Sequence, residues 1–188
     1  LASAKIKEVP YTETRGTMNT QDTHGWPQSG LVHIETGDSF AAAHGGGVAR
    51  IEPVRTAYEM LEALDIRRKV FVDEQKVDMA EEYDGLDRHA LHALAYVDGR
   101  AVGTLRLLRD GDTGKVGRFA VLREYRGRGV GRALLDWVIR VSPSLGLRKL
   151  ALHAQTHAAA FYEKAGFRVC GPEFMEAGIP HVPMEREI

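Results

Sequence analysis

The stretch that decides the fold is Arg126-Gly127-Arg128-Gly129-Val130-Gly131-Arg132, which follows an expected strand and opens an expected amphipathic helix. Glycine permits backbone conformations and close approaches that a Cβ atom would block. The free N–H groups at the start of a helix point at whatever binds there, and arginine side chains add charge-assisted hydrogen bonds. The stretch therefore predicts a loop that binds an anion, and a pyrophosphate would suit its geometry.

The glycine-rich loop by itself is compatible with more than one role. It could be an exposed basic turn that binds nothing. A P-loop would end in Gly-Lys-Ser/Thr, and a dinucleotide-binding fold would usually place the loop after its first strand, with an acidic residue about 20 positions later. The chain meets neither condition, so a nucleotide-binding module is the weaker alternative.

The segments on both sides of the loop predict a mixture of strands and helices. Residues 91–97 and 101–108 have the pattern of two strands joined by the hairpin signal Asp98-Gly99. After the loop, one helix face is marked by Leu134, Trp137, Val138 and Val141, and the helix ends near Ser142-Pro143 and Gly146. Further strands are expected at residues 48–54, 115–121, 149–154, 167–170 and 179–188, and further helices at 56–72 and 157–165. Because of Pro180 and Pro183, the last strand is expected at an edge of the sheet or in irregular structure. The chain therefore has the pattern of one α+β domain on a mixed sheet.

Length, charge and cysteine content narrow the class of protein. The 188 residues fit one domain with a substantial core. The 25 Lys and Arg residues nearly cancel the 26 Asp and Glu residues, so no overall charge would recruit nucleic acid or an anionic membrane. Cys170 is the only cysteine, which excludes an internal disulfide and suits a reducing compartment. No apolar run approaches the ~20 residues of a membrane-spanning helix, so a cytoplasmic protein is expected.

The first part of the chain differs in composition from the rest. Residues 1–47 scatter Gly among Ser, Thr, His and Ala without sustained apolar periodicity. We expect residues 1–47 to be a flexible leader or an added segment, and residues 48–188 to be the folded domain.

Two motifs resemble signatures of the GNAT superfamily of N-acetyltransferases. Arg126-x-x-Gly129-x-Gly131, after the strand Arg118-Phe119-Ala120-Val121, is similar to the motif with which these enzymes bind the pyrophosphate of CoA. The stretch from Gln155 to Phe161-Tyr162-Glu163-Lys164-Ala165-Gly166-Phe167 resembles their second signature, an amide residue followed by Phe-Tyr-x-Lys-x-Gly-Phe. Similarity to a bacterial subfamily of small GNAT proteins extends to residues 67–75, 82–92 and 174–184, so the resemblance covers roughly residues 48–188.

The resemblance implies a fold and a cosubstrate. The family's central sheet is mixed and mostly antiparallel, with about six to seven strands flanked by helices, and acetyl-CoA donates the acyl group. Backbone amides of the loop would hold the pyrophosphate, and the strand that ends at Val121 would pair with the pantetheine arm. The implied cofactor-binding residues are Phe119, Ala120, Val121, Arg126, Gly127, Arg128, Gly129, Val130, Gly131, Arg132 and Gln155.

The resemblance also implies catalytic roles. Tyr162 would be the general acid, because the departing CoA thiolate needs a proton that a nearby phenol can donate; an ordinary core aromatic is its alternative role. The family's oxyanion donor, a backbone N–H, maps near Val121. The general base stays open, because many members carry a glutamate on the strand at 115–121 and this chain has none there. Candidates for the base are His153, Glu74, Glu82, Asp84 or a water chain, and Glu74, Glu82, Asp84 and His181 are also expected to border the acceptor.

These residues lead to a functional expectation with open alternatives. The enzyme would transfer an acetyl group from acetyl-CoA to a primary amine of a small-molecule or peptide acceptor, by direct attack in a ternary complex. Transfer of another acyl group, or a catalytically silent module that senses acyl-CoA, are alternatives, because the loop recognises CoA rather than the acyl group.

Partners and metals complete the expectation. The pairs His89/His92 and His153/His157 have metal-like spacing but no clear third ligand, so no metal is expected. No nucleic-acid or membrane partner is expected either, and the resemblance is compatible with a homodimer.

Overall fold

The computed structural model of this protein describes residues 40–42 and 49–188, in which nine strands form one sheet. The strand order is β1-β2-β3-β4-β5-β6-β9-β7, with β8 paired to β9. Neighbouring strands are antiparallel except for β5 and β6, which run parallel. The strands are β1 (Phe40–Ala42), β2 (Ala49–Pro53), β3 (Leu91–Val97), β4 (Arg100–Asp110), β5 (Thr113–Val121), β6 (Lys149–Gln155), β7 (Arg168–Val169), β8 (Phe174–Glu176) and β9 (Ile179–Glu187). This mixed, mostly antiparallel sheet confirms the expected fold class.

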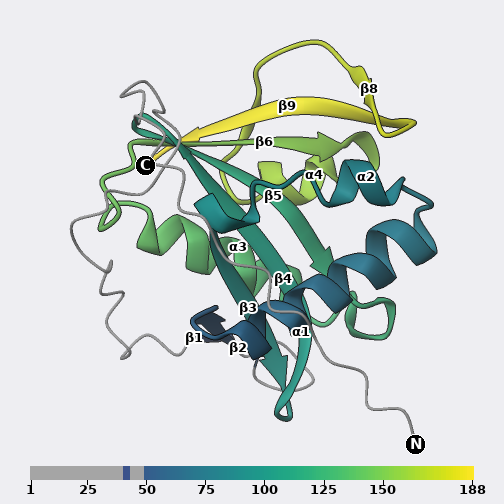
Figure 1. Ribbon diagram of the computed structural model, residues 1–188. Helices are drawn as coiled ribbons and strands as arrows, with labels where there is room; N and C mark the ends of the chain where they lie inside the picture. The colour runs from purple at the N-terminus through teal and green to yellow at the C-terminus, as the bar shows by residue number, and fades with distance from the viewer. Residues whose placement is uncertain (1–39, 43–48) are drawn as a thin grey trace, which may run out of the picture.

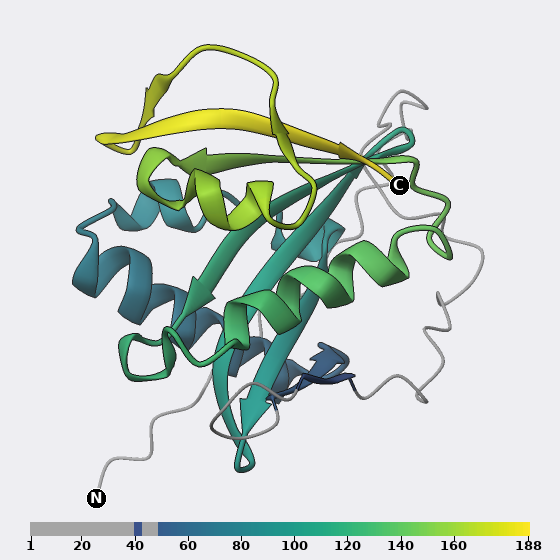
Figure 2. The same ribbon diagram turned by 180° about the vertical axis from the view of Figure 1, so that it is seen from behind.

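Helices cover both faces of the sheet. The α-helices are α1 (Ala57–Arg67), α2 (Met79–Glu82), α3 (Val130–Val141) and α4 (Ala159–Glu163), and short 3₁₀ turns lie at Asp87–His89, Arg123–Tyr125 and Thr156–Ala158. Figure 1 shows α1 and α2 in front of the sheet, and Figure 2 shows α3 and α4 in front of the opposite face. Within the described ranges, no helix combines the length and apolar character needed to span a membrane.

Helix α3 packs its predicted apolar face against the sheet. Leu134, Trp137 and Val138 are completely buried, and Val141 is nearly so. Burial of each such side chain contributes about 1.5–3 kcal/mol to the free energy of folding. The helix ends where expected, and the Ser142 hydroxyl donates to the Val138 carbonyl at 2.6 Å. The 3.6-residue period in the sequence therefore identified this helix correctly.

Helix α1 begins with a capping box and ends in an unusual way. The Thr56 hydroxyl accepts the Glu59 N–H at 3.2 Å, while the Glu59 carboxylate accepts the Thr56 N–H at 2.9 Å. The single helix expected over 56–72 is instead an α-helix to Arg67 that continues as a π-helix over Arg68–Glu74. Such wide turns are rare and are often found at functional sites. Here the π-helix carries the chain to Glu74 and Gln75, which meet the glycine-rich loop and β6.

The sheet has more strands than the six to seven expected. Strand β8 had no strong signal of its own, and β1 pairs Phe40–Ala42 with β2 although these residues fall within the expected leader. The rest of that leader, and Val48 at the start of the expected strand 48–54, lie outside the described residues.

The expected edge position of the last strand is wrong. Strand β9 lies between β6 and β7 and pairs with β6 from Lys149↔Glu187 to Gln155↔His181. Proline is tolerated there because the Pro183 carbonyl accepts from the Cys170 N–H, on the side away from β6. In an antiparallel strand, the N–H and C=O of one residue point to the same side. The missing N–H of Pro183 is therefore not lost from the β6 ladder.

Strands β5 and β6 diverge in the middle of the sheet. Their parallel pairing runs only from Thr113↔Lys149 to Lys115↔Ala151, although β5 continues to Val121 and β6 to Gln155. Figure 1 shows the two strands separating beyond this point. Beyond this point the facing edges of β5 and β6 no longer pair with each other. The divergence opens the sheet toward the end of β5 that leads into the glycine-rich loop.

Candidate active site

A cleft of about 490 Å³ occupies the gap between β5 and β6. Its walls come from both faces of the sheet: Phe161 and Tyr162 belong to α4, whereas Gln75 and Glu81 come from the π-helix end and α2. The cleft therefore passes through the sheet, and it is bordered both on the α3 and α4 face and on the α1 and α2 face.

The glycine-rich loop presents backbone donors at the start of α3. Gly127 and Gly129 have φ angles of 72° and 81°, in the left-handed region that glycine adopts without a Cβ penalty. Gly129 is the N-cap, and the first intrahelical hydrogen bond runs from the Ala133 N–H to the Gly129 carbonyl. The N–H groups of the first helical turn consequently lack intrahelical acceptors, and the helix dipole adds a partial positive charge at the same point. This arrangement can hold a diphosphate.

The arginine side chains of the loop mainly brace it. Arg126 donates from Nε to the Val121 carbonyl at 2.9 Å, and its two terminal nitrogens lie 2.6 and 2.8 Å from the Glu74 carboxylate oxygens. Through this hydrogen bond Arg126 lowers the pKa of Glu74. Arg132 bonds Asp136 on its own helix at 2.8 Å. The guanidinium of Arg128 lies 5.5 Å from the centre of the Tyr125 ring, in a cation–π arrangement. Anion binding by the loop would therefore rest chiefly on the backbone.

Tyr162 lies on the α4 side of the cleft in an aromatic cluster. Its ring packs edge-on against Phe161 at 4.9 Å and against Phe119 and Phe167 at 6.1 Å. Burial raises the pKa of the Tyr162 phenol well above its ordinary value, so the hydroxyl keeps its proton. Within residues 40–42 and 49–188 this hydroxyl has no hydrogen-bond partner. A protonated phenol that lines the cleft and is not otherwise engaged is free to donate.

The other residues predicted to bind the cofactor lie on β5 and β6, the two strands that border the cleft. Phe119 lines the cleft, Ala120 is buried in the sheet, and Val121 ends β5 at the carbonyl that Arg126 holds. Gln155 ends β6 and donates from its amide to the Gln75 side chain at 3.1 Å, which ties β6 to the π-helix end.

Two predicted histidines lie on the opposite side of the cleft. Because side chains along a strand alternate, His153 shares the face of Gln155, which points toward the π-helix end. His153 Nδ1 lies 2.8 Å from a Glu176 oxygen. His181 is nearly buried and its Nδ1 lies 2.8 Å from the Ile179 carbonyl, so that nitrogen is used within its own hairpin.

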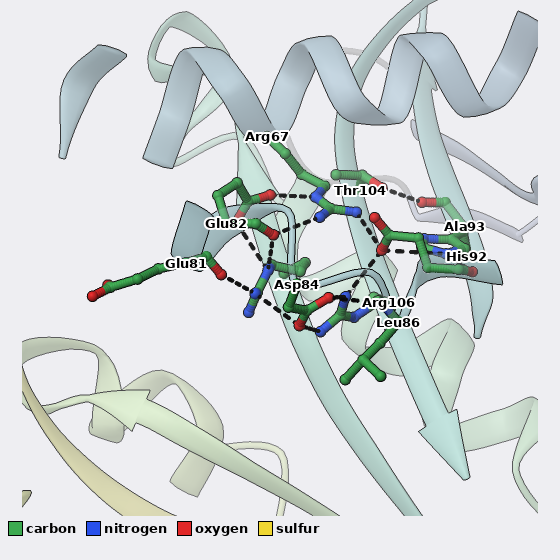
Figure 3. A network of polar contacts seen from close by, with 11 residues as sticks. Arg67, Glu81, Glu82, Asp84, Leu86, His92, Ala93, Thr104 and Arg106 are labelled. Atoms are coloured by element: carbon green, nitrogen blue, oxygen red, sulfur yellow. Dashed lines mark hydrogen bonds and ion pairs between the residues drawn. The ribbon is translucent and has the colours of Figure 1, made fainter. Parts of the chain in front are cut away.

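A buried network of charges lies beside α2 (Figure 3), and two of its members, Glu82 and Arg118, line the cleft. Arg67 is fully buried and bonds both Glu82, which is 2% exposed, and Asp87. Arg106 donates to the two oxygens of Asp84 at 2.7 and 2.6 Å. Together with Arg118 the network contains three arginines and three carboxylates, which matches each buried charge with opposite ones.

The network is joined to β5 by a bulge. The pairs Thr104↔Ala120 and Arg106↔Gly117 leave Arg118 and Phe119 opposite the single residue Leu105. Arg118 has a φ of 48° and donates to the Glu81 carbonyl at 2.7 Å and to Asp84 at 3.0 Å. The bulge thus points Arg118 to the α2 face while Phe119 faces the aromatic cluster.

His153, Tyr162 and Glu82 line one cleft, and Gly131 of the loop lies against Phe119 and Phe161 of its lining, but arginines hold all three predicted carboxylates. Glu74 pairs with Arg126, and Asp84 pairs with Arg106 and Arg118, both in ion pairs. Glu82 is enclosed by Arg67 and Arg118, and burial raises the pKa of its carboxyl. Of the four side chains considered for the base, only His153 is not held by an arginine in the part of the chain that the structure describes.

A family model described as acetyltransferase (GNAT) domain matches residues 55–188, which include the loop, the diverging strands and the cleft. The chain belongs to the GNAT acetyltransferases. This family carries out acyl-CoA-dependent acyl transfer, so the chain is an acyl-CoA-dependent acyltransferase.

Individual relatives agree with the family assignment. The uncharacterized protein YyaT of Bacillus subtilis (strain 168) is 40% identical over 141 residues, which are 73% of this chain and 95% of YyaT. The crystal structure of an acyl-CoA N-acyltransferase from Pseudomonas aeruginosa is similar with a TM-score of 0.65 and 32% identity, and the match covers 73% of this chain and 98% of that one. The fold is also shared with an aminoglycoside 6'-N-acetyltransferase complexed with coenzyme A, at a TM-score of 0.60 and 14% identity over 73% and 96% of the two chains.

The GNAT domain also has cleft residues that the sequence analysis assigned no role. Arg118, Glu81 and Glu176 line the cleft beside the predicted residues. Glu176 precedes Ala177-Gly178, and this two-residue pair between strand-like segments was the signal that could have revealed the β8–β9 hairpin. No group of three His, Cys, Asp or Glu residues suited to a metal occurs in the described ranges.

Proposed function

We propose that this GNAT domain transfers the acetyl group of acetyl-CoA to a primary amine by direct attack in a complex that holds both substrates. The observation that carries the proposal is the cleft that passes through the sheet between β5 and β6. CoA would enter from the face with the glycine-rich loop, and the amine from the face with His153. The two reactants can then meet without a covalent acyl-enzyme intermediate, because neither has to leave before the other binds.

The splayed edge of β5 supports binding of the pantetheine arm. Beyond Lys115 the backbone groups of β5 that face β6 have lost β6 as a partner. An extended chain with amide groups, such as pantetheine, can pair with such a free edge, and a backbone N–H near Val121 can bind the oxygen that becomes negative during attack. The diphosphate would then lie on the amides of the loop, at the far end of the same strand.

Tyr162 would act as the general acid. The amine nitrogen forms a bond to the thioester carbon, the C–S bond breaks, and its electron pair leaves on sulfur. The phenol proton neutralises that charge, and burial keeps the proton on Tyr162 until it is needed.

The test is product formation from acetyl-CoA across a panel of primary amines, including polyamines, amino acids and short peptides. Free CoA should be measured by chromatography and the acetylated amine by mass spectrometry, because Cys170 is exposed and would react with thiol reagents. At least one amine should give equal amounts of CoA and N-acetyl product. If CoA binds but no amine is acetylated, the domain is a sensor of acyl-CoA; if other acyl-CoA esters react faster, the acyl group is different.

Tyr162→Phe tests the acid role with the ring packing preserved. We expect kcat to fall roughly tenfold or more while the affinity for CoA stays nearly constant, because a positioned acid contributes about 10² to 10⁴ in rate. Tyr96→Phe is the matched control, since the Tyr96 hydroxyl bonds Glu62 at 3.1 Å and does not line the cleft. Unchanged kcat in Tyr162→Phe, with chemistry limiting the rate, would leave Tyr162 only a packing role.

A further inference from the structure

The acceptor side of the cleft holds a histidine and a carboxylate in direct contact. His153 Nδ1 and Glu176 Oε2 are 2.8 Å apart, a normal hydrogen-bond distance, and both residues line the cleft. An ionised carboxylate can only accept a hydrogen bond, so the hydrogen of a neutral His153 ring must lie on Nδ1. The lone pair of that ring is then on Nε2.

The neighbouring ring fixes the plane of the histidine. Phe174 packs edge-on against His153, with ring centroids 4.8 Å apart and an angle of 80° between the planes. Phe174 and Glu176 are two positions apart on β8, so they project to the same side of the hairpin. One short strand therefore supplies both contacts that orient the ring.

A tight turn holds that strand in place. Glu176 pairs with Ile179 across Ala177-Gly178, whose φ angles are 48° and 73°. Two successive residues with positive φ are typical of the type I′ turn, which matches the twist of a hairpin. Glu176 thus stands at the last position before a tight turn, and the backbone that carries its carboxylate is paired within the β8–β9 hairpin.

We propose that Glu176 is a positioning residue for catalysis, which keeps His153 in the Nδ1–H tautomer so that Nε2 serves as the general base. The inference rests on the proposed function. As the C–N bond forms and the C–S bond breaks, His153 Nε2 takes one proton from the attacking nitrogen and Tyr162 gives one proton to the sulfur. Solvent then carries the proton from the His153 imidazolium to the Tyr162 phenolate, so no co-reactant is needed. In other enzymes, too, a third group such as a carboxylate orients the histidine that acts as the base.

The tautomer can be measured without any substrate. In a long-range ¹H–¹⁵N correlation spectrum in mildly alkaline buffer, the His153 ring is identified among the eight histidines as the signal absent from His153→Gln. We expect the wild-type ring to carry its hydrogen on Nδ1. Glu176→Ala should move it toward the Nε2–H form, whereas Glu176→Gln, whose amide oxygen can still accept, should keep the Nδ1–H form. A wild-type ring with its hydrogen on Nε2 would overturn the proposal.

The second test is kinetic and uses an amine that the wild-type protein acetylates. Glu176→Ala should lower kcat about tenfold or more with little change in the KM for acetyl-CoA, and Glu176→Gln should restore most of the loss. The matched control is Glu173→Ala, because Glu173 directly precedes β8 and accepts from the Thr156 hydroxyl at 3.2 Å but does not line the cleft. If Glu176→Ala turned over like the wild type, or if Glu173→Ala lost as much, Glu176 would be an ordinary surface carboxylate.

Failure of the inference can be told from failure of the proposed function. The absence of N-acetyl product from every amine in the wild type contradicts the proposed function, whatever the tautomer. Normal acetylation by Glu176→Ala contradicts only the role of Glu176.

Discussion

Two regions beside the cleft, the glycine-rich loop and helix α2, are held in different ways. The glycine-rich loop obtains its shape mainly from residues close in sequence: two left-handed glycines, the start of α3, and the bond from Arg126 to Val121 five positions earlier, to which the exposed ion pair of Arg126 with Glu74 is added. Helix α2 is held instead by a buried network of ion pairs between residues far apart in sequence. Arg67 and Glu82 are 15 positions apart, and Arg118 and Asp84 are 34 apart.

The difference separates two kinds of sensitivity. A loop that binds through backbone N–H groups depends on its conformation and little on its side chains. A buried network of ions depends on every member, because removal of one leaves another charge in a medium of low polarity without compensation. We therefore expect substitutions in the network around α2 to lower the stability most, and substitutions in the loop to weaken CoA binding most.

The largest effect is expected from breaking the network at Arg67. Arg67→Met should lower the free energy of unfolding by about 3–5 kcal/mol, because Glu82 and Asp87 lose a fully buried partner. Urea unfolding measures the change. Lys69→Met is the control, since Lys69 pairs with Asp65 at the surface and should change stability by less than about 1 kcal/mol. Equal effects in the two variants would mean that the network contributes no more than an exposed ion pair.

A smaller loss in the free energy of unfolding should appear at acidic pH. The hydrogen bonds from Arg106 lower the pKa of Asp84 from 3.8 to about 2. A carboxyl whose folded pKa is depressed contributes stability above its unfolded pKa, and this contribution is lost as pH falls toward the folded value. Between about pH 5 and pH 2 the chain should lose about 2 kcal/mol through Asp84, partly offset by Glu82, whose raised pKa favours the folded state in acid.

Asp84→Asn should flatten the acid dependence of stability between these pH values. The control is Asp78→Asn, because Asp78 caps α2 by accepting the Ala80 N–H and asparagine can do the same. Unfolding curves recorded at several pH values measure the slope. An unchanged slope in Asp84→Asn would assign the acid loss to other carboxyls.

The smallest effect in free energy should come from the loop, and it should appear in binding. Gly127 and Gly111 both have positive φ, at 72° and 62°, and both have open space where a Cβ would lie. Alanine at either position is strained by about 1–2 kcal/mol. We expect Gly127→Ala to weaken CoA binding about tenfold in calorimetric titration, and Gly111→Ala to leave it unchanged although it is equally strained. Similar affinities in the two variants would show that loop conformation does not determine binding.

The parts of the fold that were predictable have local causes. The helical spacing of Leu134, Trp137 and Val138 predicted the position of α3, and Asp98-Gly99 predicted the turn of the β3–β4 hairpin. Both signals lie within a few residues, where propensity and turn chemistry decide the structure. The loop was predictable for the same reason.

The parts that were not predictable depend on distant partners. Glu74, Glu82 and Asp84 were all expected to border the acceptor. Each of them is held by an arginine 15 to 52 positions away, and the local sequence gives no sign of these ion pairs. The interior place of β9 depends on which side Pro183 presents to β6, which only the assembled sheet determines. Glu176 acquires its contact with His153 through a hairpin turn, so its position could not be read from residue type alone.

Amide hydrogen exchange with and without CoA tests the central claim most directly, because the claim concerns backbone N–H groups. With CoA at saturation, shown by calorimetry, exchange should slow at residues 126–132 and along the free edge of β5, and should stay unchanged in α2. Protection of α2 together with unchanged exchange at residues 126–132, while CoA is bound, would contradict the account.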